Sequence, residues 1–185
     1  MSEENWIDAA VLRARQNGWN RETLRQALED CGEPAEMMSS AFPRGVTGAI
    51  ADWTKLTDAR MDEAAAAEDL ADLRIPARIR RVVELRLRLL EPDRDALRAA
   101  MAFLALPWNA PAGIRLLGRT ASVIWHAAGD TSADFSWYTR RATLSAVYVA
   151  TLAFWMRPVQ PDIDEVLSFL DRRLQDLPKP RPKAA

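Results

Sequence analysis

The sequence predicts an all-α protein of about nine helices. Only seven of its 185 residues are glycine, and Ala, Leu, Arg and Glu, which favour helices, are frequent. Apolar residues recur three and four positions apart along most of the chain, and eleven prolines separate these periodic segments. No Asn-Gly or Asp-Gly pair stands between alternating apolar runs, so β-hairpins are not expected.

The first part of the chain predicts three short helices. The Asn17-Gly18 pair suits the left-handed cap that ends a helix, and Gly32 suits the same role one helix later. Asn20 is expected to cap the start of the second helix through its side chain. The third begins at Pro34, a residue favoured in a first helical turn. The expected ranges are 5–16, 21–31 and 34–41.

Six longer helices are expected after these. Pro76 and Pro107 interrupt the periodic pattern, and Asn109 is expected to cap the helix that follows it. Residues 144–156 are almost continuously apolar, but a bilayer span needs about 20 such residues, so this segment predicts a buried or pocket-lining helix. The expected ranges are 46–73, 77–90, 92–106, 109–128, 133–157 and 162–177.

Helical spacing also predicts which residues of these six helices face inward. The helix at 77–90 carries two apolar stripes, which is typical of a central helix. The inward positions are Ile50, Trp53, Thr57 and Met61; Ile79, Val83, Leu87 and Leu90, with Val82, Leu85 and Leu89; Leu97, Met101 and Leu104; Ile114, Leu117, Ala121, Ile124, Trp125 and Ala128; and Ile163, Val166, Leu167, Leu170 and Leu174.

Three parts of the chain are distinguished by this pattern. Residues 1–45 form a small head, residues 46–177 a larger helical domain, and residues 178–185 a basic, proline-rich tail with nothing to pack. The chain begins with acidic residues, whereas secretory and transit peptides begin with basic ones. We therefore expect a cytoplasmic protein, with peripheral contact at the inner face of the membrane.

Composition argues against several kinds of catalytic or metal site. A single cysteine, Cys31, excludes an intrachain disulfide and argues against a thiolate-rich metal site, and a single histidine, His126, leaves too few imidazoles for zinc or iron. His126 is interpreted as structural, since no general base stands at a helpful spacing. Glycine-rich phosphate loops and nucleophile elbows are absent. No cofactor, metal or enzymatic activity is expected.

The head has the outline of a helix-turn-helix, but its charge is unfavourable for DNA. Residues 1–75 carry 8 basic and 15 acidic side chains, net −7, whereas residues 76–185 carry net +6. The segment that would enter the DNA groove, residues 34–41, has no basic residue and contains Glu36. Because DNA affinity comes mostly from Lys and Arg contacts to phosphates, we expect no nucleic-acid binding.

The most specific signal lies between residues 106 and 148. It reads Leu-Pro-Trp-Asn-Ala-Pro, then a helix ending Ile-Trp-His-Ala-Ala-Gly-Asp, then Thr-Ser-Ala-Asp-Phe-Ser-Trp-Tyr-Thr-Arg-Arg-Ala-Thr-Leu-Ser-Ala-Val-Tyr. With Glu84-Leu-Arg-Leu-Arg-Leu-Leu and Asn17-Gly-Trp, it closely resembles the coenzyme Q biosynthesis protein nine family, over about residues 5–175. These are lipid-binding accessory proteins of ubiquinone synthesis.

The resemblance implies a TetR-repressor-like fold, usually dimeric, that has lost DNA binding and carries an apolar cavity for isoprenoid lipids. Such a protein binds ubiquinone intermediates and presents them to a membrane-bound di-iron hydroxylase of demethoxyubiquinone. The surface that meets the hydroxylase maps to Asp134, Trp137, Tyr138 and Arg141. The expected lipid-binding residues are Leu87, Met101, Leu104, Leu117, Ile124, Leu144, Tyr148 and Leu152.

Simpler structural roles remain open for these residues. An aromatic pair beside Arg141 is typical of an interface hot spot, but it also suits a core aromatic with a solvated arginine. Asp134 is three residues after Thr131 and suits helix capping. The apolar stripes can pack against one another as an ordinary core. The alternative function is a ligand-responsive TetR-type repressor.

Membrane contact is expected to be weak. The chain stops after its basic tail, where eukaryotic members of the resembled family continue into a further amphipathic helix. Attachment is then left to the ninth helix, the cavity rim, and Lys179, Arg181 and Lys183 of the tail.

Overall fold

The structure, a computed structural model, describes residues 3–129, 136–159 and 161–175, with the side chains of 3, 4, 136–138 and 140 left aside. Every regular element in this part of the chain is helical, which confirms the predicted all-α class. The elements are α1 (Glu3–Asn17), α2 (Arg21–Asp30), the 3-10 helix η1 (Ala35–Met37), α3 (Met38–Ala41), α4 (Gly45–Ala66), α5 (Ile75–Leu90), the 3-10 helix η2 (Glu91–Asp93), α6 (Arg94–Leu104), α7 (Ala110–Ala127), α8 (Ser136–Trp155) and α9 (Ile163–Gln175).

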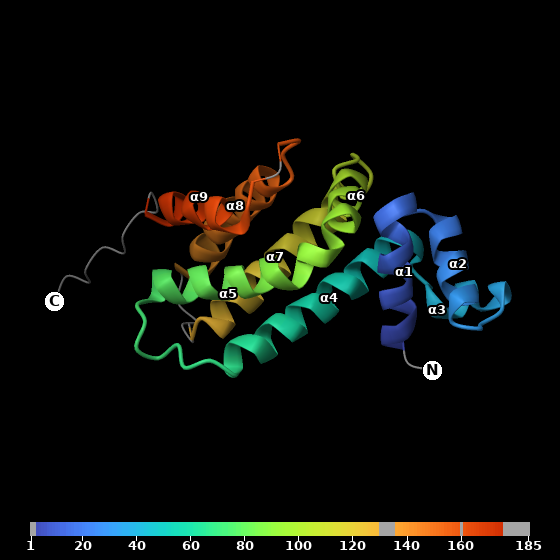
Figure 1. Ribbon diagram of the computed structural model, residues 1–185, viewed down its shortest axis with the longest axis horizontal. Coiled ribbons are helices and arrows are strands. Elements are labelled where there is room, and N and C mark those ends of the chain that lie inside the picture. The colour runs from blue at the N-terminus through green and yellow to red at the C-terminus, as the bar shows by residue number, and fades with distance from the viewer. Residues whose placement is uncertain (1–2, 130–135, 160, 176–185) are drawn as a thin grey trace.

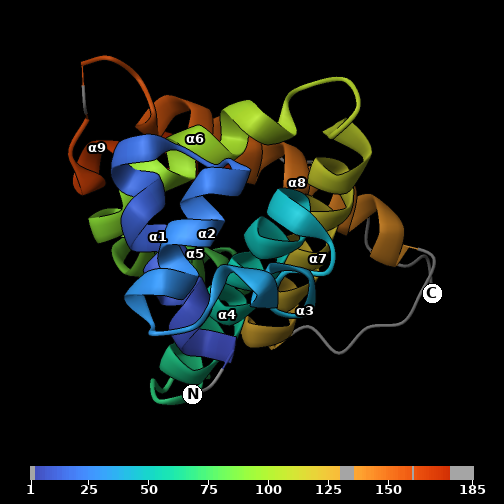
Figure 2. The same cartoon turned by 90° about the vertical axis from the view of Figure 1, so that its right-hand side faces the viewer.

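The molecule is elongated, with the head α1–α3 at one end and the α8–α9 pair at the other (Figure 1). The long helix α4 leads from the head along the body, where it packs against α5 and α7. In the perpendicular view, α1–α3 lie in front of the remaining helices (Figure 2). A single hydrophobic cluster runs from α1 to α9, so the head and the body share one core.

The turns of the head follow their predicted chemistry. Gly18 has φ +67° and Gly32 has φ +75°, values at which a side chain would be strained, so glycine suits both helix ends. Asn20 caps α2: its side-chain oxygen accepts a hydrogen bond from the backbone N–H of Thr23 at 2.9 Å. The third predicted helix is split into the one-turn elements η1 and α3.

Trp19 ties the head to the body. Its indole Nε1 donates a hydrogen bond to the backbone oxygen of Ala96 on α6 at 2.9 Å, and its ring lies 5.6 Å from that of Trp53 on α4. All three residues are buried. A buried indole contributes a large apolar surface to the contact, and its N–H hydrogen bond fixes the orientation of the ring.

The fourth helix is shorter than predicted. We expected helix to residue 73, but α4 ends at Ala66. The Asp69 carboxylate accepts from the N–H of Ala71, a local bond that competes with helix, and Arg78 of α5 donates to the backbone oxygens of Ala71 and Leu73. These bonds from α5 provide hydrogen-bond donors for backbone oxygens of the loop, and periodicity could not predict them.

The helix α5 is central, as its two stripes predicted, but only one stripe is fully buried. Ile79, Val83, Leu87 and Leu90 belong to the core, as does Val82, whereas Leu85 is half-buried and Leu89 is exposed. Buried among them are two charged residues, Glu84 and Arg86. Periodicity alone did not predict these buried charges.

The helices α6 and α7 depart most from the predicted faces. On α6 the buried positions are Ala96 and Ala100, while Leu97, Met101 and Leu104 are half-buried, because small residues allow Trp19 to approach. The Asn109 side chain does not cap α7 as predicted: its Nδ2 donates to the backbone oxygen of Phe103 at 3.0 Å, at the end of α6. Ile114, predicted to face inward, is exposed.

The helices α8 and α9 form the last pair of the bundle. Val166, Leu167, Leu170 and Leu174 of α9 are buried as predicted, and Ile163 is half-buried. The helix begins with a reciprocal capping box between Asp162 and Glu165, at 2.8 and 3.2 Å. Across the described helices, none is long and apolar enough to cross a bilayer.

Candidate functional site

The predicted partner surface consists of Asp134, Trp137, Tyr138 and Arg141 and is called the partner strip below. It begins before α8 and continues onto that helix. Asp134 lies outside the described residues, and Trp137 and Tyr138 are on the first turn of α8 with side chains outside the description. Arg141 is half-buried, and its Nε donates to the Ser122 hydroxyl of α7 at 3.1 Å. The arginine therefore helps join α7 to α8, and the role of the strip at a partner surface stays a prediction.

The predicted lipid-binding residues divide into a buried and a half-buried group. Leu87, Ile124, Leu144, Tyr148 and Leu152 belong to the hydrophobic core, where they come from α5, α7 and α8. Met101 and Leu104 of α6 and Leu117 of α7 are half-buried and pack against that core. A Cβ added at Gly113 of α7 would lie 3.3 Å from the Leu104 Cβ, so the two helices are in close contact there.

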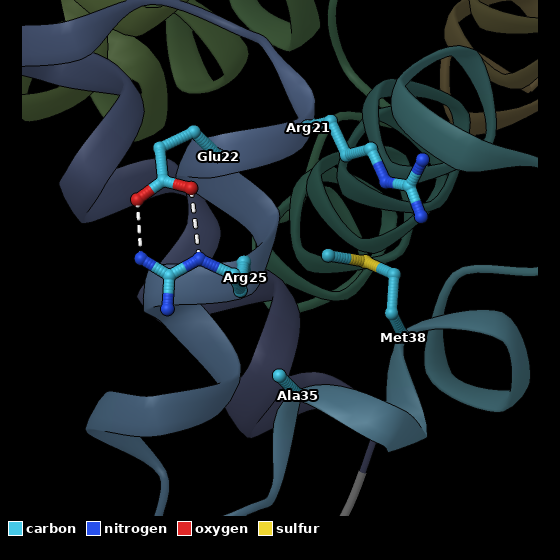
Figure 3. Close-up of a pocket in the computed structure, with 5 residues that line it drawn as sticks. All are labelled: Arg21, Glu22, Arg25, Ala35 and Met38. Atoms are coloured by element: carbon cyan, nitrogen blue, oxygen red, sulfur yellow. Dashed lines mark hydrogen bonds and ion pairs between the residues drawn. The ribbon is translucent and has the colours of Figure 1, made fainter.

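Two surface pockets in the head, each of about 400 Å³, contain none of the predicted lipid-binding residues. In the first, Arg21, Glu22 and Arg25 of α2 stand opposite Ala35 and Met38 (Figure 3). The Arg25 guanidinium is turned to Glu22 and forms a bidentate pair with it (Figure 3). Arg25 also pairs with Glu29, so its charge is largely neutralised.

A buried polar cluster joins four helices at the centre of the body. Arg86 of α5 pairs with Asp58 of α4, with Nη1 and Oδ1 2.5 Å apart, and its Nε donates to the Tyr148 hydroxyl of α8 at 2.7 Å. Thr120 of α7 donates from its hydroxyl to both Asp58 oxygens, at 3.1 and 3.2 Å. The Asp58 and Arg86 side chains are only 2% and 5% exposed.

Burial decides the proton affinities in this cluster. Loss of water raises the pKa of the Asp58 carboxyl above its ordinary value, although Arg86 and Thr120 act in the opposite direction. Burial likewise raises the pKa of the Tyr148 hydroxyl, which stays a neutral phenol that accepts from Arg86. The arrangement is thus an ion pair in which one hydroxyl accepts from Arg86 and another donates to Asp58.

The cluster brings together two distant parts of the resemblance. Arg86 lies in the Glu84-Leu-Arg-Leu-Arg segment, and Tyr148 ends the long signature 62 residues later. The neighbouring Glu84 accepts from Arg88 at 2.8 Å and pairs with Arg80 and Arg81 at 3.4 and 3.0 Å. The sequence did contain a signal for this cluster, because the charged residues Glu84 and Arg86 stand between the apolar stripes of α5. A charge in such a position normally requires a buried partner.

The described residues show no grouping suited to metal. No cluster of three or more His, Cys, Asp or Glu side chains occurs among them. His126 is exposed on the last turn of α7. Cys31 is half-buried, and burial raises the pKa of its thiol.

Comparison with known proteins gives consistent matches. Residues 110–179 match the COQ9 family model. Ubiquinone biosynthesis protein COQ9, mitochondrial, of Rattus norvegicus is 31% identical over 177 residues, which cover 92% of this chain and 56% of that protein. The Homo sapiens protein of the same name is 42% identical over 98 residues, 53% of this chain and 31% of that protein.

Among solved structures, the crystal structure of the TetR transcriptional regulator from Nitrosomonas europaea ATCC 19718 is similar, with a TM-score of 0.72. It covers 94% of this chain and 95% of its own, at 23% identity, so the likeness is one of fold. The chain spans 56% of the Rattus protein and a smaller share of the human one. Taken with the family match over residues 110–179, these alignments show that the chain belongs to the COQ9 family and has a TetR-like fold.

Proposed function

We propose that this chain is a non-enzymatic accessory protein of ubiquinone biosynthesis. It binds isoprenoid quinone intermediates and presents them to a membrane-associated di-iron hydroxylase of demethoxyubiquinone, acting as a homodimer. The observation that carries the proposal is the family match over residues 110–179, because this region contains α7, α8 and α9, the whole partner strip and most of the signature.

The placement of the apolar residues supports the lipid part of the proposal. Met101, Leu104 and Leu117 are half-buried and pack against the hydrophobic core to which Ile124 and Leu144 belong. Flexible and half-buried apolar side chains can separate to admit a prenyl chain at less cost than a close-packed core. The opposing interpretation, that these residues only pack against each other, predicts that no prenyl lipid binds.

The lipid experiment uses purified full-length protein. Lipids that co-purify are extracted and identified by mass spectrometry, and the melting temperature is measured with and without a prenylated quinone. A ligand at 100 times its Kd should stabilise the fold by about 2.7 kcal/mol. A quinone without the prenyl tail is the matched control, and we expect it to shift the melting temperature far less.

An unchanged melting temperature with the prenylated quinone, together with no co-purifying lipid, would contradict lipid binding. Stabilisation by the tail-free quinone to the same degree would show that the apolar residues are not the binding surface.

The partner strip is tested by binding to the hydroxylase. We expect Trp137→Ala and Arg141→Ala to weaken binding by about 2 kcal/mol each, the scale of interface hot spots. Ser122→Ala is the matched control, because it removes the 3.1 Å bond from Arg141 while the arginine remains. If Ser122→Ala weakens binding as much as Arg141→Ala, the arginine acts by joining α7 to α8.

Stability must be measured on the same variants. A loss of about 3–5 kcal/mol of unfolding free energy in Trp137→Ala would identify a core tryptophan and contradict the strip.

The alternative, a TetR-type ligand-responsive repressor, is favoured by the fold match alone. The head argues against it. Among the described residues, Arg13, Arg15, Arg25 and Arg44 pair with carboxylates, and Arg21 is the head arginine without such a partner. A head with its cations neutralised offers little to DNA phosphates.

A further inference from the structure

The turn between α6 and α7 exposes an unusual set of apolar side chains. Trp108 is 74% exposed and Ile114 is 71% exposed. Leu106, Pro107 and Pro111 are also exposed and surround them in sequence. We call Leu106, Pro107, Trp108, Pro111 and Ile114 the apolar tip. A tryptophan held in water without a polar role is costly, so this surface suits a partner that covers it.

The apolar tip is held in place by its backbone. The N–H groups of Asn109 and Ala110 both donate to the Leu106 oxygen at 2.9 Å, and the Asn109 side chain donates to the Phe103 oxygen at 3.0 Å. The exposure of Trp108 therefore belongs to an ordered turn. An ordered apolar surface loses little conformational entropy when a partner covers it.

A second apolar turn projects in the same direction as the apolar tip. The α6–α7 turn and the α8–α9 turn both project at the top of the molecule in the two perpendicular views, and Figure 2 shows them on opposite sides of that top (Figures 1 and 2). In the α8–α9 turn, Val159 is 88% exposed and follows the exposed Arg157 and Pro158. Two apolar turns that project in one direction from opposite sides of the molecule suit a broad, flat partner better than a pocket in a small protein.

The charge around the apolar tip identifies that partner. Residues 96–129 contain no Asp or Glu, although the chain as a whole has 26, and they contain Arg98, Arg115 and Arg119. In the part of the chain that the structure describes, neither Arg115 nor Arg119 forms a salt bridge. Apolar side chains led by a tryptophan and flanked by arginines are the composition of surfaces that enter an anionic bilayer interface.

A second copy of this chain is the less suitable occupant. A two-fold interface would bring the same patch onto itself, and residues 96–129 offer no carboxylate to the Arg115 of the other copy. Anionic phospholipid headgroups supply the missing negative charge.

We propose that the apolar tip is a docking surface for the anionic phospholipid bilayer, in which Trp108 and Ile114 enter the interface and Arg115 and Arg119 contact headgroups. This differs from the sequence expectation, which assigned membrane contact to the basic tail, the ninth helix and the cavity rim. It rests on the proposed function in one respect: the bilayer is where a prenylated quinone is collected.

The experiment is co-sedimentation of the full-length protein with vesicles free of quinone. Vesicles of phosphatidylcholine alone are compared with vesicles that also contain phosphatidylglycerol. We expect wild-type protein to bind the anionic vesicles, and Trp108→Ser/Ile114→Ser to bind about tenfold more weakly or less. Arg115→Gln should reduce binding to the anionic vesicles only. Val159→Ser should give a smaller loss than the double variant.

Leu12→Ser is the matched control, since Leu12 is an apolar residue 58% exposed on α1, away from the apolar tip in sequence and element. It should bind as wild type. Depth is checked with brominated lipids, which should quench wild-type tryptophan fluorescence clearly more than that of Trp108→Phe, a variant that keeps an apolar ring and its binding.

Three results would overturn the proposal. The first is equal vesicle binding by wild type and Trp108→Ser/Ile114→Ser. The second is equal quenching of wild type and Trp108→Phe. The third is a change from dimer to monomer in the double variant by sedimentation velocity, which would make the apolar tip a contact between copies. Because the vesicles hold no quinone, failure here is separate from failure of the lipid-extraction experiment.

Discussion

At the scale of single residues, the Arg86 side chain links α5 to two other helices. It is buried, it pairs with Asp58, and it donates to Tyr148, so three helices meet at one guanidinium. The planar fork of arginine suits this role, because it can address a carboxylate and a hydroxyl at once. A lysine would supply charge without that geometry.

We predict that Arg86→Ala lowers the unfolding free energy by about 3–5 kcal/mol, because Asp58 is left buried without its ion-pair partner. Tyr148→Phe should cost about 1.5–3 kcal/mol, the range for a hydrogen bond to a charged group. Urea denaturation of the variants measures both.

The control is the pair Asp58→Asn/Arg86→Met, which removes both charges. Its loss of unfolding free energy should be smaller than the sum of the losses in Asp58→Asn and Arg86→Met measured singly, with a coupling of about 0.5–3 kcal/mol. Simple additivity would show that the two side chains do not form a stabilising unit.

Glu84 provides a prediction of pH dependence. Burial acts to raise its pKa, but hydrogen bonds from Arg88 and Arg81 outweigh burial and hold the pKa below the ordinary value of 4.5. A carboxylate with a lowered folded-state pKa stabilises the fold above about pH 4.5, and this contribution is lost as the pH falls through the folded pKa.

We therefore expect Glu84→Gln to cost about 2 kcal/mol at neutral pH, with the difference from wild type shrinking at acidic pH. Unfolding free energies at several pH values give the test. Glu36→Gln, an exposed carboxylate in the head, is the control and should change little at either pH. A pH-independent loss in Glu84→Gln would point to packing rather than charge.

At the scale of elements, the helix ends divide into local and tertiary cases. The start of α9 is local, since Asp162 and Glu165 cap it reciprocally within one turn. The end of α4 is tertiary, since Arg78 and Arg81 of α5 bind the loop that follows it, at Leu73 and Glu68. Periodicity overran the second boundary because the bonds from α5 leave no mark in the local apolar pattern.

The local cap can be tested directly. Asp162→Ala should lower the unfolding free energy by about 1 kcal/mol, because the N–H of Glu165 loses its acceptor. Asp162→Asn keeps an oxygen acceptor and should recover most of that loss. Equal losses in the two variants would mean that charge, and not the hydrogen bond, is what stabilises the start of α9.

At the scale of the whole molecule, the head is part of the body's core. Trp19 donates to Ala96 of α6, and its ring meets Trp53 of α4, so the head is anchored on two helices of the body. A head kept for packing needs apolar and indole contacts. A head that binds DNA also needs uncompensated cations on the helix that enters the groove.

We predict that the protein does not bind duplex DNA. The elements η1 and α3 carry no basic residue, and Glu36 would repel phosphates. Fluorescence polarisation with mixed duplexes at about 0.15 M salt is the measurement. Micromolar binding that weakens steeply as salt rises would contradict the prediction and would favour the repressor alternative.

The sequence by itself determined the helical class, most helix bounds, and the caps at Asn20, Gly18 and Gly32, because these depend on periodicity and on bonds within one or two turns. The family signature also came from residues alone. Only the tertiary structure decided that Ala96 rather than Leu97 faces the core, that Ile114 faces outward beside Trp108, and that Arg86, Asp58 and Tyr148 meet. Each of these depends on residues tens of positions apart, and an apolar stripe does not show which neighbour will cover it.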